Sequence, residues 1–191
     1  MADNGDVDVL DGVFGKLETL VAGVRPDQLD DPTGCPGYDV RGMLNHIVGF
    51  LRNFAVAAQG RKADFDPTQV RSDDPVKDVK VAAEQAIQGW RELGTDREVS
   101  VMGPGAPGEV VLGMTIIEYV AHGCDLALAT GQPIPFTDDE FAVALARAEP
   151  VLTDQYRGEG KPFGLRIDVP ADAPVRERFL AFMGRRDVAA R

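Results

Sequence analysis

A chain of 191 residues is long enough to fold around one well-packed core and too short for two domains to be expected. Hydrophobic residues make up 44% of it and charged residues 27%, a composition that is typical of globular proteins and excludes a disordered chain. The net charge of −11, without a basic block, argues against nucleic-acid and anionic-membrane partners, because both need Lys and Arg to neutralise phosphates. Small molecules, metals and other proteins remain as partners.

Hydrophobic spacing predicts helices along most of the chain. In residues 7–24, apolar side chains recur at three- and four-residue steps, which predicts a first amphipathic helix. A Pro/Gly/Asp loop follows, and Asp39 then stands at the N-cap position of a second helix. After a breaker-rich loop over residues 61–74, Pro75 begins a third helix that runs to about Leu93.

The second half of the chain contains one stretch with strand character. Within residues 99–112, a Gly/Pro turn is flanked by Val99, Val101, Val110 and Leu112, so we expect a short hairpin or an extended loop there. A fourth helix is predicted from about Met114 to Ala129, and Thr137 is the start signal of a fifth that runs to about Tyr156. A proline-spaced tail ends in one short helix. The sequence therefore predicts an all-α fold, a four-helix bundle with an additional helix and a short C-terminal tail.

The location of the protein is predicted from what the sequence lacks. The sequence contains no run of eighteen or more apolar residues, so no transmembrane helix is predicted. The polar, acidic N-terminus does not resemble a secretory signal. Two cysteines, Cys35 in a loop and Cys124 on a predicted helix, are too few for a disulfide framework, so both are expected to be reduced thiols. We therefore expect a cytoplasmic protein.

The two histidines are the candidates for chemistry. His46 and His122 both lie in the middle of predicted helices beside apolar residues, where the ring nitrogens need partners. Glu118 precedes His122 by four residues, so their side chains lie on one helix face, one turn apart. If the helix of His46 packs against this face, the three residues form a divalent-metal site with an open position, as in catalytic zinc sites. Spacing alone leaves open that Glu118 and His122 form an ordinary helix-stabilising pair.

Other polar residues near the histidines have two interpretations. Asp125, three residues after His122, could accept a hydrogen bond from the imidazole and orient it, or lie on the helix surface. Arg41 and Arg52 could hold a substrate carboxylate, although we expect both to be solvated. Tyr38 could line the mouth of a pocket.

Two further groups are expected to have no role in chemistry. Asn45 points about 100° away from His46 around the helix axis, which favours a structural role. A small basic cluster near the end of the chain is expected to be a solvated terminus. Its members are Arg185, Arg186 and Arg191.

A resemblance to a known family rests on two segments, CPGYDVRGMLNHIVG and EYVAHGCDLALATGQ. Together they resemble the DinB/YfiT-like metalloenzyme superfamily. More narrowly, they are similar to the actinobacterial branch related to the N-terminal domain of mycothiol-dependent maleylpyruvate isomerase. The resemblance covers nearly all of residues 1–191 and implies a single metal-binding helical domain. It places the metal ligands, for zinc or nickel, on His46, Glu118 and His122.

The resemblance also implies an activity. Members of this family that act as enzymes use a low-molecular-weight thiol, mycothiol or bacillithiol, whose sulfur the metal binds and activates. It implies a metal-dependent thiol S-transferase or isomerase that acts on an electrophilic substrate. Two departures count against the isomerase: the chain lacks the further C-terminal domain of that enzyme, and Cys124 stands where relatives often have Trp. On an ideal helix Cys124 points away from the ligand face, as a small buried thiol does.

Two alternatives to an enzyme remain. The first is a non-catalytic bundle that binds a metal or a small ligand. The second is a bundle with an empty pocket that acts in protein interaction. An apolar bundle face could also support a homodimer.

Overall fold

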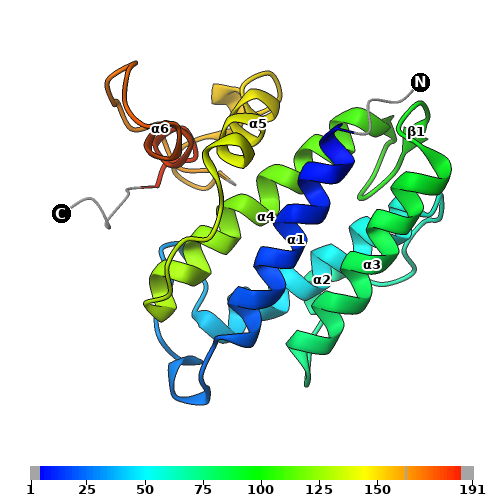
Figure 1. Ribbon diagram of the computed structural model, residues 1–191, viewed down its shortest axis with the longest axis horizontal. Coiled ribbons are helices and arrows are strands. Elements are labelled where there is room, and N and C mark those ends of the chain that lie inside the picture. Colours follow the sequence, from blue (N-terminus) through cyan, green and yellow to red (C-terminus); the bar gives the residue numbers. More distant parts are fainter. Residues whose placement is uncertain (1–4, 162, 186–191) are drawn as a thin grey trace.

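The computed structural model describes residues 5–161 and 163–185, and its main elements are helices (Figure 1). Four long helices form the bundle; of two shorter ones, the first packs against the fourth long helix and the second packs against the first short one. The long helices are α1 (Gly5–Ala22), α2 (Val40–Ala58), α3 (Pro75–Leu93) and α4 (Gly108–Thr130); the shorter ones are α5 (Asp138–Ala148) and α6 (Val175–Phe182). The predicted all-α bundle with an additional helix is therefore confirmed.

The helix starts follow from the capping residues that the sequence indicated. Asp39 accepts a hydrogen bond from the backbone N–H of Gly42 at 2.7 Å and so begins α2. Thr137 and Glu140 form a capping box at the start of α5, each side chain accepting from the backbone N–H of the other. Gly131, with φ of 68°, ends α4 in the left-handed region.

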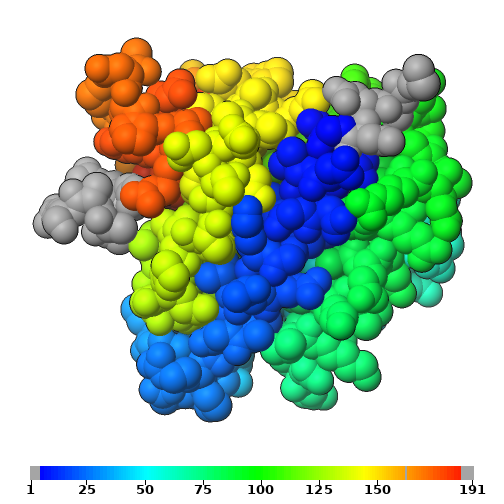
Figure 2. All heavy atoms as spheres, viewed as in Figure 1, coloured from blue at the N-terminus to red at the C-terminus, as the bar shows by residue number. Residues whose placement is uncertain are grey.

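Helix α4 is the central element of the core. It contacts α1, α2 and α5, and its side chains are buried on nearly all sides. In the space-filling view, the side chains of α1 fill the space between α3 and the side formed by α4 and α5 (Figure 2). By length and composition α4 could span a membrane, but 83% of its apolar window is buried inside the fold. Such burial is typical of the core helix of a soluble bundle.

A close contact between α2 and α3 depends on glycine. A Cβ atom at Gly89 of α3 would lie 2.7 Å from the carbonyl carbon of Ala58 in α2. Such a distance is shorter than any van der Waals contact between carbon atoms. The absence of a side chain at Gly89 therefore allows the two backbones to approach.

Two predicted element boundaries are wrong. The hairpin exists, but β1 (Glu98–Val99) pairs with β2 (Ala106–Pro107), and α4 begins at Gly108, six residues before the predicted Met114. Val110 and Leu112, which the sequence suggested as strand residues, therefore lie on a helix.

Helix α5 ends at Ala148 instead of continuing to Tyr156. Pro150 lies two residues beyond this end, has no backbone N–H to donate, and disfavours helical geometry in the residue before it. Residues 154–156 form a separate short 3-10 turn.

The C-terminal segment, residues 163–185, is fastened by hydrogen bonds from a buried arginine. Arg157 donates to the carbonyl oxygen of Phe182 at 2.7 Å and to that of Gly164 at 3.3 Å. The backbone N–H of Ile167 donates to Ala181 at 2.9 Å. These contacts join residues 164–167 and the end of α6 to each other and to Arg157.

Candidate metal centre

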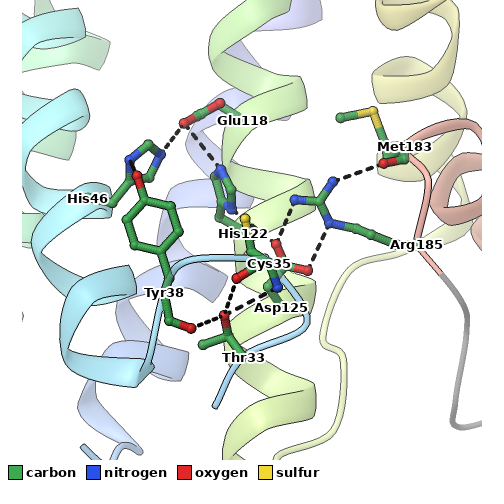
Figure 3. Close-up of polar contacts among 9 residues, drawn as sticks. All are labelled: Thr33, Cys35, Tyr38, His46, Glu118, His122, Asp125, Met183 and Arg185. Carbon is green, nitrogen blue, oxygen red and sulfur yellow. Dashed lines mark hydrogen bonds and ion pairs between the residues drawn. The ribbon is translucent and has the colours of Figure 1, made fainter. Parts of the chain in front are cut away.

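Helices α2 and α4 bring together the three residues that the sequence selected (Figure 3). His46 comes from α2, whereas Glu118 and His122 lie one turn apart on α4. Glu118 Oε1 is 2.8 Å from His46 Nε2 and 3.4 Å from His122 Nε2. The two imidazole rings are 4.7 Å apart between centroids. Both rings thus present the same nitrogen to one carboxylate oxygen.

The spacing of these atoms fits a divalent metal ion. Zinc lies about 2.0–2.2 Å from nitrogen and oxygen ligands, so two ligands of a tetrahedral ion are about 3.4 Å apart. The ligand atoms of His46, Glu118 and His122 all lie within 4.8 Å of one another, with two separations of 2.8 and 3.4 Å. The three side chains could therefore hold an ion after small adjustments, and three protein ligands leave a fourth position for another molecule.

The other ring nitrogens have partners of their own. Nδ1 of His46 is 3.2 Å from the hydroxyl oxygen of Tyr38, and Nδ1 of His122 is 3.0 Å from Asp125 Oδ2. In the metal-free protein each Nε2–H donates to Glu118. When a metal is bound, a proton held on Nδ1 by its oxygen partner would leave the lone pair of Nε2 for the ion. Asp125 is buried, with 2% of its surface exposed, so of the two interpretations that the sequence left open, the contact with His122 is the one observed.

The charges of the cluster depend on one another. Burial alone would raise the pKa of Glu118, but the charge of His122 and hydrogen bonds from both histidines lower it well below its usual value. Burial alone would lower the pKa of His122, but the charge of Glu118 and the hydrogen bond with Asp125 raise it to about 9. Without a metal, a proton on His122 therefore compensates the charge of the Glu118 carboxylate.

Arg185 is a site residue that the sequence reasoning missed. Its Nε donates to Asp125 Oδ1 at 2.8 Å, and its Nη2 donates to Asp125 Oδ2 at 2.7 Å. Only 15% of its side chain is exposed, so the prediction of a solvated terminus is wrong for this residue. Arg186 and Arg191 lie outside the described residues. The contact spans 60 residues of sequence, and no local motif indicates it.

A cavity of about 170 Å³ borders the cluster on the side of Glu118 and His122. Its walls come from the loop before α2, from α4 and from the C-terminal segment. The walls include Cys35, Ala121, Phe163, Met183 and Arg185. Burial, together with the charge of Asp125, raises the pKa of the Cys35 thiol.

The two thiols differ in their relation to the site. Cys35 Sγ lies within 4.8 Å of a ring nitrogen of His122 and a carboxylate oxygen of Asp125. Cys124 is fully buried in α4, in agreement with the prediction of a buried thiol. The two cysteines do not form a disulfide with each other.

A second cavity of about 350 Å³ lies on the other side of His46. Tyr38 and Arg41 line it, and Arg41 also pairs with the exposed Asp30 at 3.3 Å. Arg52 instead lies over the ring of Phe65. The structure thus brings Tyr38 to His46 and leaves both arginines outside the cluster.

Asn45 has the structural role that its direction predicted. Its side-chain oxygen accepts a hydrogen bond from the backbone N–H of Ser72 at 2.9 Å. This bond ties the loop before α3 to α2.

Comparison with known proteins identifies the family. Residues 11–127, more than half of the chain, match the family described as the mycothiol maleylpyruvate isomerase N-terminal domain. The chain belongs to this family. Two relatives, uncharacterized proteins from two strains of Mycobacterium tuberculosis, are each 33% identical over 168 residues, which cover 87% of this chain and 90% of each relative. No solved structure gives a significant match.

The family match encloses the cluster but not all of its surroundings. His46, Glu118, His122 and Asp125 lie within the residues that match the isomerase N-terminal domain family. Arg185 lies 58 residues beyond the end of the match, which is at residue 127. The C-terminal segment therefore adds a contact to a cluster built on the family core.

Proposed function

We propose that this protein binds a divalent metal ion, zinc or nickel, through His46, Glu118 and His122 and uses it as a mycothiol-type thiol S-transferase. The observation that carries the proposal is that both Nε2 atoms face one Glu118 oxygen, at 2.8 and 3.4 Å, while each Nδ1 contacts another oxygen. Membership of a mycothiol-related family supports the thiol as co-substrate. Isomerisation of a thiol adduct is the second activity that the family suggests.

The metal would supply Lewis acidity, which lowers the pKa of a thiol bound at the open position. The protein residues supply the geometry. His46 and His122 offer neutral nitrogens, and Glu118 offers a negative charge that offsets part of the charge of the ion. Tyr38 and Asp125 accept the Nδ1 protons and so keep the rings in the orientation that binding requires.

The cavity beside Glu118 and His122 has the size expected for a small reacting group. Its volume of about 170 Å³ accommodates a thiol methylene and a compact electrophile, whereas the sugar portion of a mycothiol-type thiol must extend outward. Phe163 and Met183 give it apolar walls, which would favour displacement of water when a substrate binds. Displacement of water would strengthen the attraction between a thiolate and the metal.

The proposal is tested by thiol consumption in the presence of a compact electrophile such as an aryl halide. The protein is assayed with mycothiol, first stripped of metal and then with added zinc or nickel. We expect a rate that depends on the metal and is lost in His46→Ala. Arg52→Ala, on the same helix but away from the cluster, is the control and keeps the rate. A metal-dependent rate that survives in His46→Ala contradicts the ligand assignment.

A bound metal without thiol turnover favours the alternative function, a non-catalytic bundle that binds a metal or a small ligand. We also propose that the chain is a single cytoplasmic domain that has no nucleic-acid or membrane partner. One continuous hydrophobic core that includes α1 and α6 supports the single domain, and the charge of −11 supports the partner assignment.

A further inference from the structure

We infer that Arg185 is a positioning residue of the metal centre, which acts through Asp125 to hold the imidazole of His122. The inference rests on the proposed metal site. It adds to that site a residue from the C-terminal segment, outside the sequence region that defines the family. Its consequence is that docking of this segment and metal binding depend on each other.

The contacts form a continuous series from the C-terminal segment to the cluster (Figure 3). Arg185 donates two hydrogen bonds to Asp125, at 2.8 and 2.7 Å, one to each carboxylate oxygen. Asp125 Oδ2 lies 3.0 Å from His122 Nδ1, and His122 Nε2 lies 3.4 Å from Glu118 Oε1. No side chain of this series has more than a quarter of its surface exposed.

The two parallel bonds from Arg185 fix the plane of the Asp125 carboxylate. A carboxylate held by one bond can rotate about its χ2 angle, which is a soft torsion. The planar fork of a guanidinium matches both oxygens at once, and a lysine ammonium cannot do so. Since Oδ2 is the atom beside His122, a fixed carboxylate plane also fixes the direction of the imidazole ring.

The structure holds Arg185 itself in place. Its backbone N–H donates to the carbonyl oxygen of Leu180 at 2.8 Å, and its Nη1 donates to that of Met183 at 3.2 Å. Arg157 fastens the preceding residues through the carbonyl oxygen of Phe182. The guanidinium therefore reaches Asp125 from a backbone that is anchored at several points.

Because docking of the C-terminal segment and binding of the metal use the same contacts, their free energies are coupled. If docking of the C-terminal segment strengthens metal binding by some factor, metal binding strengthens docking by the same factor. Residues that orient a metal-bound histidine typically change metal affinity about 10- to 100-fold when they are substituted. We expect an effect of this size at Arg185.

The first test is zinc affinity, measured by competition with a chromophoric chelator. The proteins are the wild type, Arg185→Gln, Arg185→Lys and the control Arg166→Gln. Arg166 lies on the same segment, is half exposed and contacts Asp154 and Phe182 instead of the cluster. We expect affinity to fall about 10- to 100-fold in Arg185→Gln and by less in Arg185→Lys, and to stay unchanged in the control.

The second test reports on His122 directly. The chain has only two histidines, so ring ¹⁵N spectra of the tag-free, zinc-loaded protein contain two imidazoles. We expect the wild type to show a His122 Nδ1–H protected from exchange with solvent, and both Arg185 variants to lose this protection. Should Arg185→Gln not fold, the same signal in Arg185→Lys decides.

The outcomes separate this inference from the proposed function. Wild-type protein that binds no zinc overturns both. Zinc binding by the wild type, with unchanged affinity or an unchanged His122 signal in the Arg185 variants, overturns the inference and leaves the metal site standing. A lower melting temperature together with an unchanged His122 signal would show that Arg185 only fastens the C-terminal segment.

Discussion

Zinc affinity is expected to depend steeply on pH, because the ion must displace a proton from His122. In the metal-free protein the pKa of His122 is raised to about 9, because the charge of Glu118 and the hydrogen bonds with Asp125 and Glu118 together outweigh the effect of burial. At pH 7 about 99% of the His122 side chains then carry the proton. The apparent affinity is therefore about 100-fold below that of the deprotonated protein, and it rises about tenfold per pH unit toward pH 9.

Two measurements check this prediction. Competition with a chelator of known pH dependence gives the affinity between about pH 6.5 and 8, where we expect the tenfold rise per unit. Calorimetry in buffers of different ionisation enthalpy counts the protons, and we expect about one from His122 at pH 7. Asp125→Asn removes a hydrogen bond that raises the pKa of His122, so its affinity should level off at a lower pH. An affinity that is constant across this range would refute the reasoning.

Three further predictions concern stability and the second histidine. The pKa of His122 lies above its unfolded value of 6.5, so its contribution to stability is complete below about pH 6.5 and is lost as the pH rises toward 9. The melting temperature of the metal-free protein should therefore fall over this pH range. A constant melting temperature contradicts the charge assignment. In chemical denaturation, Gly89→Ala should destabilise the protein by about 1–3 kcal/mol, because the added Cβ meets the backbone of α2. The control Gly15→Ala has open space around its Cβ and should stabilise the protein by about 1 kcal/mol. Equal effects of the two substitutions would refute the packing argument. Tyr38→Phe removes the oxygen beside Nδ1 of His46 and should weaken zinc binding about tenfold or more, with little change in melting temperature. An unchanged zinc affinity would show that Tyr38 does not orient His46.

The sequence could predict the parts of the fold that depend on local signals. Asp39, Pro75 and Thr137 mark helix starts because capping and the proline ring act within one turn. The convergence of Glu118 and His122 on one face follows from helix geometry alone. The contribution of His46 required the additional assumption that α2 packs against α4, which the structure bears out.

The errors occur where local patterns are ambiguous or where the contact is distant. The segment around Val110 and Leu112 is a short apolar run that fits a strand or a helix, yet packing continues α4 back to Gly108. Arg185 looked like a terminal charge, because its position beside Asp125 depends on the path of the whole C-terminal segment. Cys35 likewise lies beside His122 only because the loop before α2 folds over α4.

The most direct test of the central claim is the metal content of the purified protein, measured by plasma mass spectrometry without added metal or chelator. Wild type is compared with the double variant Glu118→Ala/His122→Ala and with Arg52→Ala as a control. The account predicts about one equivalent of zinc or nickel in wild type and control, and loss of this metal in the double variant. Wild-type protein that contains no metal, and takes up none when zinc is added, contradicts it and leaves Glu118 and His122 as an ordinary ion pair within α4.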